Sequence, residues 1–481
     1  MKYVYKENAI AFVDGISDKI TEISHKIWEY AELSLKEYKS AELCVSECLK
    51  MGFEVKRGLS GIDTAFSASF GSGRPVIGIL AEYDALSGLS QEACSAEKEP
   101  IIPGGPGHGC GHNMLGAGSF GAACAVKDYL EKSGKEGTVI LYGCPGEEGG
   151  AAKAFMARDG VWKDLDCALT WHPGDTNEVS TGTCNSSIQV LYTFKGIAAH
   201  AAGNPEMGRS ALDAMELMNV GVQFLREHMP SDCRVHYAII NGGGVSPNVV
   251  QPEASVLYMV RSVEVKDSAA LLSRVDKIAE GAALMTETSL ERQFIDGTAN
   301  TVPNSVLEKL IHDNLKYVPL PEHTEEELSF AAKVYATYEK SGRLPGMGAA
   351  ASPSIAEEVR EAVRACPKGL YDFVMPFYTG NEFHPGSTDV GDVSWQTPAA
   401  QFNTVCFAAD APGHSWQNVS FGASSIGDKG TVQAAKVLAC AAIDLFEKPE
   451  ALESAKEEFS KRMEGKEYVC PIPDGAVPVA I

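Results

Sequence analysis

The chain has 481 residues, of which 44% are hydrophobic and 22% are charged, as in an ordinary globular protein. Its length exceeds what one small core usually accommodates, so it predicts two domains, or one domain with a large insertion. The formal net charge of −23 repels phosphate backbones and anionic membranes, which argues against a nucleic-acid-binding or membrane-binding protein.

Short apolar runs alternate with helical stretches in the first part of the chain and again near its end. The apolar runs predict buried strands at 75–82, 138–144, 167–171 and 404–409. Helices are predicted at 114–131 and 431–446. Such alternation is typical of an α/β domain with a mostly parallel central sheet and helices on both faces.

The middle of the chain has a different order of elements. Its pattern predicts strands at 188–195, 234–241, 254–262 and 290–295, with helices at 209–228 and 267–286. The resulting order β-α-β-β-α-β is the ferredoxin-like α+β arrangement. We therefore expect an inserted domain at 187–298 between the two parts of a catalytic domain, 1–186 and 299–481. Helices are again predicted after the insertion, at 305–317 and 324–338.

The cysteines and the N-terminus bear on the compartment. There are 13 cysteines, an odd number without paired spacings, which favours a reducing environment over a disulfide scaffold. The first residues lack the apolar run of a signal peptide, and we find no stretch of about 18 apolar residues that suggests a membrane span. We expect a cytoplasmic protein.

Two short motifs contain the side chains of a metal site. The string G-H-G-C-G-H-N at 107–113 separates Cys110 from His112 by one glycine, and C-P-G-E-E-G-G at 144–150 contains Glu147 and Glu148. A thiolate, imidazoles, carboxylates and one spare carboxylate are what a divalent-metal hydrolase needs. Taken singly, however, a cysteine is most often a small buried hydrophobe, and adjacent glutamates are usually a solvated turn.

The order of strands strengthens the metal hypothesis. In an open parallel sheet, ligands bind outside the carboxyl ends of the strands. Each of the four predicted strands is followed by a residue that can bind a metal: Asp84, Glu147 with Glu148, His172 and His414. Such convergence favours a functional site over four unrelated surface residues. A cysteine hydrolase, with Cys110 as nucleophile and a nearby histidine as base, is the alternative from a different class.

The motifs together resemble a known family. The strings H-G-C-G-H-N, G-E-E-G-G, W-H-P, K-G-I-A-A-H-A-A and S-T-D-V-G-D-V-S-W are similar to those of the dinuclear-metal aminoacylase and carboxypeptidase family, which includes hippurate hydrolase and the auxin-conjugate amidohydrolases. The resemblance covers nearly the whole chain. It implies hydrolysis of the amide between an acyl group and an amino acid, with p-aminobenzoyl-glutamate as a candidate substrate. It also implies two divalent ions, manganese or zinc.

The resemblance assigns roles within the catalytic domain. Glu147 would be the general base, which later protonates the leaving amine. Glu82 stands where the family usually has an aspartate that orients a ligand from behind. Cys110 would bridge the two ions as a thiolate. The five implied metal ligands are Cys110, His112, Glu148, His172 and His414.

The resemblance also implies that the inserted domain is a lid through which the chain forms a homodimer, or a heterodimer with a related subunit. His200 would polarise the scissile carbonyl, supplied across the dimer. Asn248 and Arg261 would bind the substrate carboxylate, for which a guanidinium group is the apt bidentate partner. Two departures bear on specificity: Asn113 replaces the usual aspartate, and the region 318–381 is longer than in simpler members.

Other functions remain open on the sequence alone. The chain could be a dipeptidase of the same family that acts on β-alanyl dipeptides, or a subunit that needs a partner for activity. Three aromatic residues are candidates to line an aromatic acyl pocket and are equally good candidates for the core. They are Phe383, Trp395 and Trp416.

Overall fold

The computed structural model describes residues 2–346 and 352–480, so residues 347–351 of the long 318–381 region lie outside it. A seven-stranded sheet runs through the larger body of the molecule, in the spatial order β1-β2-β4-β3-β5-β13-β6. Its strands in this order are β1 (Glu54–Arg57), β2 (Phe66–Ser72), β4 (Gly137–Gly143), β3 (Val76–Ala81), β5 (Cys167–Gly174), β13 (Ala399–Val405) and β6 (Glu178–Ser180).

The four central strands, β4, β3, β5 and β13, are parallel, whereas the pairings toward both edges are antiparallel. The helices around this sheet are α1 (Lys2–Gly15), α2 (Ser17–Tyr30), α3 (Tyr38–Lys50), α4 (His112–Ser133), α5 (Ala152–Arg158), α8 (Ser305–Tyr317), α9 (Glu325–Tyr335), α10 (Pro353–Ala365), α11 (Val390–Ser394), α12 (Trp416–Phe421), α13 (Ser425–Glu447) and α14 (Pro449–Met463). A small parallel pair, β7 (Thr183–Cys184) and β12 (Phe383–His384), lies beside them.

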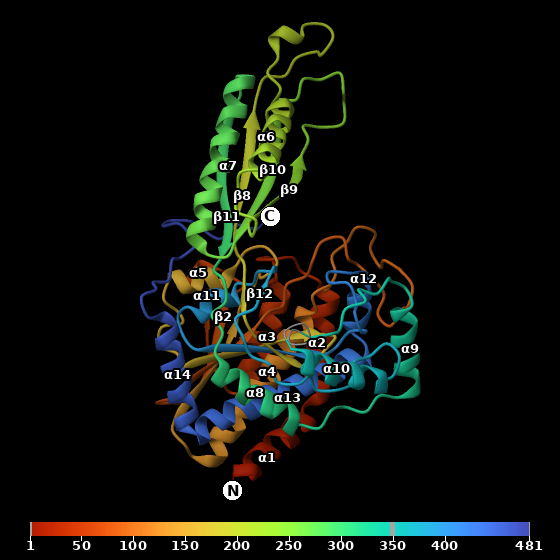
Figure 1. Cartoon of the computed structure of the whole chain (residues 1–481), viewed down its shortest axis with the longest axis vertical. Coiled ribbons are helices and arrows are strands. Elements are labelled where there is room, and N and C mark those ends of the chain that lie inside the picture. Colours follow the sequence, from red (N-terminus) through yellow and green to blue (C-terminus); the bar gives the residue numbers. More distant parts are fainter. Residues whose placement is uncertain (1, 347–351, 481) are drawn as a thin grey trace.

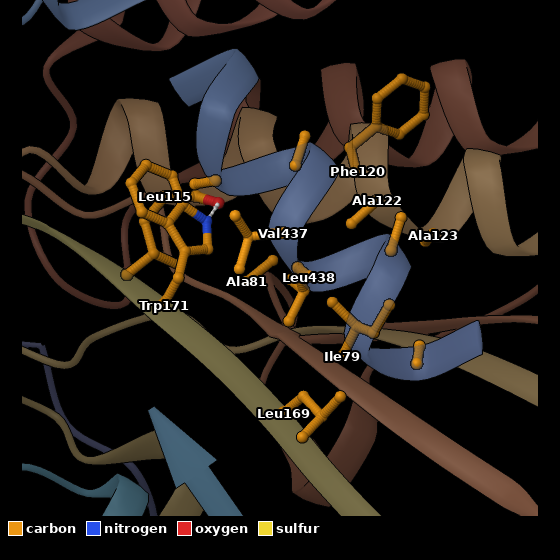
Figure 2. Packing of buried hydrophobic residues seen from close by; sticks show 14 of the residues in the cluster. Ile79, Ala81, Leu115, Phe120, Ala122, Ala123, Leu169, Trp171, Val437 and Leu438 are labelled. Carbon is orange, nitrogen blue, oxygen red and sulfur yellow. Dashed lines mark hydrogen bonds between the residues drawn. The ribbon is translucent and has the colours of Figure 1, made fainter. Parts of the chain in front are cut away.

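The core of this body forms where α4 and α13 pack on the central strands. Ile79 of β3 and Leu169 of β5 belong to the same buried cluster as Val437 and Leu438 of α13 (Figure 2). β3 is almost wholly buried, as expected for a parallel strand covered on both faces.

The glycines of α4 allow the helix to approach the sheet closely. The stretch Gly116–Gly121 fits the pattern G-x-G-x-x-G of dinucleotide-binding loops, but it follows a polar loop rather than a strand. A Cβ atom on Gly118 would lie 2.7 Å from the ring of Trp171. The indole Nε1 of Trp171 donates a hydrogen bond of 3.1 Å to the Leu115 carbonyl (Figure 2). Close packing therefore explains the small residues.

The smaller body projects from one end of the larger one (Figure 1). It consists of β8 (Ser186–Lys195), α6 (Ala211–Arg226), β9 (Arg234–Asn241), β10 (Glu253–Ser262), α7 (Val265–Thr286) and β11 (Ser289–Thr298). Its antiparallel sheet has the order β11-β8-β10-β9 of a ferredoxin-like domain, and α6 and α7 share its core. The predicted fold class is confirmed, although the central sheet is mixed at its edges.

Alternation along the lid strands separates a core face from a polar face. Ile188, Val190, Tyr192 and Phe194 of β8 are buried under the two helices. The side chains between them point the other way, since strand residues alternate with a period of two. The neighbours of Ser187 and Gln189 across the sheet are Arg261 and Met259 on β10 and Thr298 and Asp296 on β11.

Two sequence predictions need correction. The strand predicted at 404–409 is β13, which begins at Ala399 and ends at Val405. Gln401 and Asn403 interrupt its apolar run, so the pattern placed the strand too late. His172 lies within β5 rather than after it. Over the described residues, no helix is long and apolar enough to cross a membrane.

We expect Gly118→Ala to destabilise the fold by about 1–3 kcal/mol, because the added methyl group overpacks against Trp171. Gly281→Ala in α7 is the matched control. A Cβ there meets nothing within 4 Å, so the substitution should stabilise the helix by about 0.5–1 kcal/mol. Urea unfolding of both variants measures these changes, and equal effects would contradict the packing argument.

Candidate metal centre

The five predicted metal ligands converge in space. Their ligand atoms form two groups, in each of which all atoms lie within 4.8 Å of one another. The first group is Cys110, His112 and His172, and the second is Cys110, Glu148 and His414. Because Cys110 belongs to both, the arrangement has the form of two neighbouring cation sites that share one sulfur.

Local backbone geometry brings these side chains together. His112 is the first residue of α4, and the Gly111 before it has φ 82°, a left-handed conformation that favours glycine. A Cβ on Gly111 would also lie 2.8 Å from the ring of Phe407. Glu148 follows β4 in a glycine-rich turn, and His414 follows β13 in a loop where its own φ is 50°.

The imidazole of His112 is held from behind by Asp84. Its Nδ1 lies 2.8 Å from Asp84 Oδ1, and the other oxygen of this carboxylate accepts hydrogen bonds from the backbone N–H of Glu148 at 2.9 Å and the hydroxyl of Ser34 at 2.8 Å. Burial opposes ionisation of Asp84, but the adjacent His112 holds its pKa at about 2. A carboxylate behind a ligating histidine is the usual way to fix its orientation.

His172 is oriented by the backbone. Its Nδ1 lies 2.7 Å from the carbonyl oxygen of Pro173, which directs Nε2 toward Cys110 Sγ at 3.3 Å. Burial, together with the neighbouring His112, lowers the pKa of His172 to about 4. The ring is therefore neutral near pH 7, as a metal ligand must be.

The chemistry of these groups fits divalent cations. His112 Nε2 and Glu148 Oε1 are buried without a hydrogen-bond partner among the described residues. Burial and the nearby Glu148 raise the pKa of the Cys110 thiol, so a thiolate requires a cation close by. Burial and the carboxylates of Glu82 and Glu148 likewise raise the pKa of Glu147. Two bound cations would satisfy the unpartnered atoms and offset the crowded negative charge.

Glu82 belongs to a buried ion-pair network. Its Oε1 lies 2.7 Å from Lys153 Nζ, which lies 2.5 Å from Asp389 Oδ1, and its Oε2 lies 3.2 Å from His112 Nε2. All four side chains are almost completely shielded from water. Lys153 and Asp389 were not predicted, because a lysine in an alanine-rich stretch gives no sign in sequence that it is buried and paired.

The turn before Glu147 is held by another unpredicted acid. The buried Glu37 accepts hydrogen bonds from the backbone N–H groups of Gly146 at 2.8 Å and Leu35 at 2.9 Å. Its second oxygen accepts from the Thr64 hydroxyl at 3.1 Å. Burial raises the pKa of Glu37 to about 8. Asn113 is also structural, since its amide donates to the carbonyl oxygen of Gly422 at 2.7 Å, which an aspartate could not do.

A cavity of about 250 Å³ opens over this centre, between the two bodies. The predicted residues Glu147 and Arg261 line it, and the guanidinium of Arg261 donates to Ser387 Oγ at 2.9 Å. Burial raises the pKa of Asp296 in the same cavity to about 7. The lining residues that sequence analysis missed are Ala151, Ser187, Gln189, Met259, Asp296, Thr298, Ser387, Thr388 and Gln401.

His200 and Asn248 do not line this cavity. Both are exposed, and their segments lie at the end of the smaller body farthest from the larger one (Figure 1). The Asn248 carbonyl accepts a hydrogen bond of 2.9 Å from Ala201 N, beside His200. Within one chain these two residues are thus remote from the centre. Phe383, Trp395 and Trp416 do not line it either.

Comparisons with known proteins agree with this geometry. Residues 185–286 match the peptidase dimerisation domain of M20 proteins. A dinuclear metal-binding peptidase of the M20 family from Bacillus subtilis has a similar fold, with a TM-score of 0.53 and 16% identity, over 90% of this chain and 99% of that one. The chain is also 45% identical over 470 residues to the B subunit of p-aminobenzoyl-glutamate hydrolase from Escherichia coli strain K12, covering 97% of each. This chain belongs to the M20 peptidase family.

Membership of the M20 family confirms that the protein is a hydrolase from a group of dinuclear metal-binding peptidases. A second relative within the family, the Xaa-Arg dipeptidase of Mus musculus, is 26% identical over 479 residues and covers 96% of this chain and 94% of the dipeptidase.

We expect Asp84→Asn to weaken metal binding by about 10–100-fold, because the amide no longer fixes His112 as a carboxylate does. Titration of the metal-free protein with Zn²⁺ or Mn²⁺ measures the change. Asp128→Asn near the other end of α4 removes the same charge and should bind metal like the unmodified protein. Equal affinities for the two variants would refute the orienting role of Asp84.

Proposed function

We propose that this M20 hydrolase cleaves N-acyl amino acids, with p-aminobenzoyl-glutamate as its substrate. The observation that carries the proposal is the pair of ligand groups sharing Cys110 beside a further carboxylate, Glu147, in one cavity. The 45% identity to one component of a p-aminobenzoyl-glutamate hydrolase supports the choice of substrate. All 13 cysteines are free, which supports a cytoplasmic location.

The proposed ligands of two divalent ions are Cys110, His112, Glu148, His172 and His414. The thiolate and imidazoles suit zinc, and the carboxylate also accommodates manganese. When bound, such ions polarise the scissile carbonyl and make water nucleophilic at neutral pH.

Glu147 is proposed to move the protons of the reaction. Its carboxylate lies in a group with Glu82 and His112, whose atoms are within 4.8 Å of one another. Glu82 is already paired with Lys153, and Glu148 is the proposed metal ligand, so Glu147 is the carboxylate left free. It would accept a proton from the attacking water and pass it to the leaving nitrogen. Glu82 would keep the neighbouring His112 in place.

The substrate carboxylate is proposed to bind Arg261, which lies in the same cavity. His200, as oxyanion donor, and Asn248 would come from a second subunit, because both lie far from the centre of their own chain. The partner would be a second copy or a related subunit, associated through the lid. We divide the chain accordingly into catalytic segments 1–186 and 299–481 and a lid and dimerisation domain, 187–298.

Glu147→Gln should reduce kcat for p-aminobenzoyl-glutamate by about 10²–10⁴-fold while leaving the metal content unchanged, because only proton transfer is lost. Hydrolysis kinetics and metal analysis of the same sample test this. Glu54→Gln, on the exposed edge strand β1, serves as the control with normal turnover. Normal hydrolysis by the Glu147 variant would refute the proposed mechanism.

Removal of metal should abolish hydrolysis, and Zn²⁺ or Mn²⁺ should restore it. We would measure activity after chelation, with the residual metal quantified. Activity that survives complete metal removal would instead support a cysteine hydrolase with Cys110 as nucleophile. Bound metal without activity, followed by activity on adding a related subunit, would support the alternative of a partner-dependent subunit. A preference for β-alanyl dipeptides would support the dipeptidase alternative.

A further inference from the structure

A second cavity adjoins the metal centre. Its volume is about 240 Å³, and it shares Ser387, Thr388 and Gln401 with the cavity over the candidate ligands. A substrate bound at the centre can therefore extend into it. Its other walls come from the β7 and β12 pair, the start of α8, and α11 with β13.

The walls of this second cavity are largely apolar. Val302, Pro303, Val390, Ala399 and Ala400 all contribute to them. An apolar cavity of roughly 150 Å³ is large enough to hold a benzene ring. The second cavity thus has room for a substituted aromatic ring or for a long aliphatic side chain.

A buried carboxylate lies among these apolar residues. Glu308 is only 1% exposed, and its Oε2 accepts hydrogen bonds from the hydroxyls of Thr181 at 2.8 Å and Thr379 at 2.6 Å. Within residues 2–346 and 352–480, no basic side chain forms an ion pair with it. A buried carboxylate without a counter-ion is costly, so its retention calls for a ligand that supplies hydrogen-bond donors.

A second polar atom at the same cavity lacks a partner. His384 of β12 lines the cavity, and its Nε2 is buried without a hydrogen bond from any described residue. The apolar chamber therefore contains two polar groups with hydrogen-bonding capacity to spare. This is the usual composition of a small-molecule subsite, in which apolar walls give affinity and a few polar groups give orientation.

We propose that this second cavity is the subsite for a substrate group with an apolar body and a terminal N–H donor, which Glu308 accepts. The proposal rests on the proposed amide hydrolysis at the metal centre. Two sources share this chemistry: an aryl amine, as in a p-aminobenzoyl group, and the basic side chain of an arginine-containing or lysine-containing dipeptide. A carboxylate is excluded, because Glu308 repels it.

The main test compares two substrates that differ only in the amine, p-aminobenzoyl-glutamate and benzoyl-glutamate. We expect Glu308→Gln to lower the ratio of their kcat/KM values by at least about tenfold, because the lost bond is to a charged acceptor. The activity toward benzoyl-glutamate should change far less. Glu47→Gln is the matched control, since Glu47 is a buried acid on α3, outside both cavities.

Dipeptides ending in arginine or in leucine form the second arm. A loss confined to the arginine substrate would identify the basic side chain as the occupant, and a loss confined to the amino-substituted acyl substrate would identify the aryl amine. Val302→Phe, on the wall, should raise KM for whichever substrate occupies the cavity. Unchanged ratios for both pairs in the Glu308 variant would overturn the proposal.

Equilibrium binding separates this proposal from the proposed function. Calorimetric titration with p-aminobenzoate, benzoate and argininamide needs no turnover. Selective weakening of p-aminobenzoate or argininamide in Glu308→Gln supports the subsite even if no amide is hydrolysed, an outcome that would refute only the proposed function. Hydrolysis of p-aminobenzoyl-glutamate with no effect of Glu308→Gln on rates or on binding would refute the subsite alone.

Discussion

The contact between Asp84 and His112 is the one on which the rest of the centre depends. One carboxylate, at the end of a parallel strand, orients the imidazole through Nδ1 and fixes the backbone of Glu148 through its second oxygen. It thereby couples a residue from the start of α4 to a residue from the turn after β4. Because Asp84 is buried, its bonds are strong, and losing either partner would leave an uncompensated charge.

Negative charge dominates the surroundings of this contact. Glu82, Glu147, Glu148 and Asp389 are close together, and Lys153 is the buried cation that pairs with two of them. Such a cluster cannot be fully ionised in a low-dielectric interior unless further positive charge is present. The two groups that share Cys110 are where divalent ions would supply it. The geometry thus requires what the donor chemistry suggests.

The amino-acid pattern was sufficient for the parts of the fold that are periodic and local. The lid strands and helices lie close to their predicted positions, since alternation and helical spacing mark the buried faces. The five ligands could be found because β3, β4 and β5 are parallel and end at one edge. Long-range contacts could not be found: Glu37 reaches Gly146 across 109 positions and Lys153 reaches Asp389 across 236. Neither contact leaves a periodic signal.

The two cavities differ in charge, and this difference determines how a substrate can lie. Arg261 places a positive group over the metal centre, while Glu308 places a negative group in the adjoining apolar chamber. An acyl amino acid has an acidic end and a chemically different acyl end, so only one orientation satisfies both groups. The scissile amide then falls between them, beside Glu147. The long 318–381 region contributes to this selection through Thr379, which holds Glu308 in place.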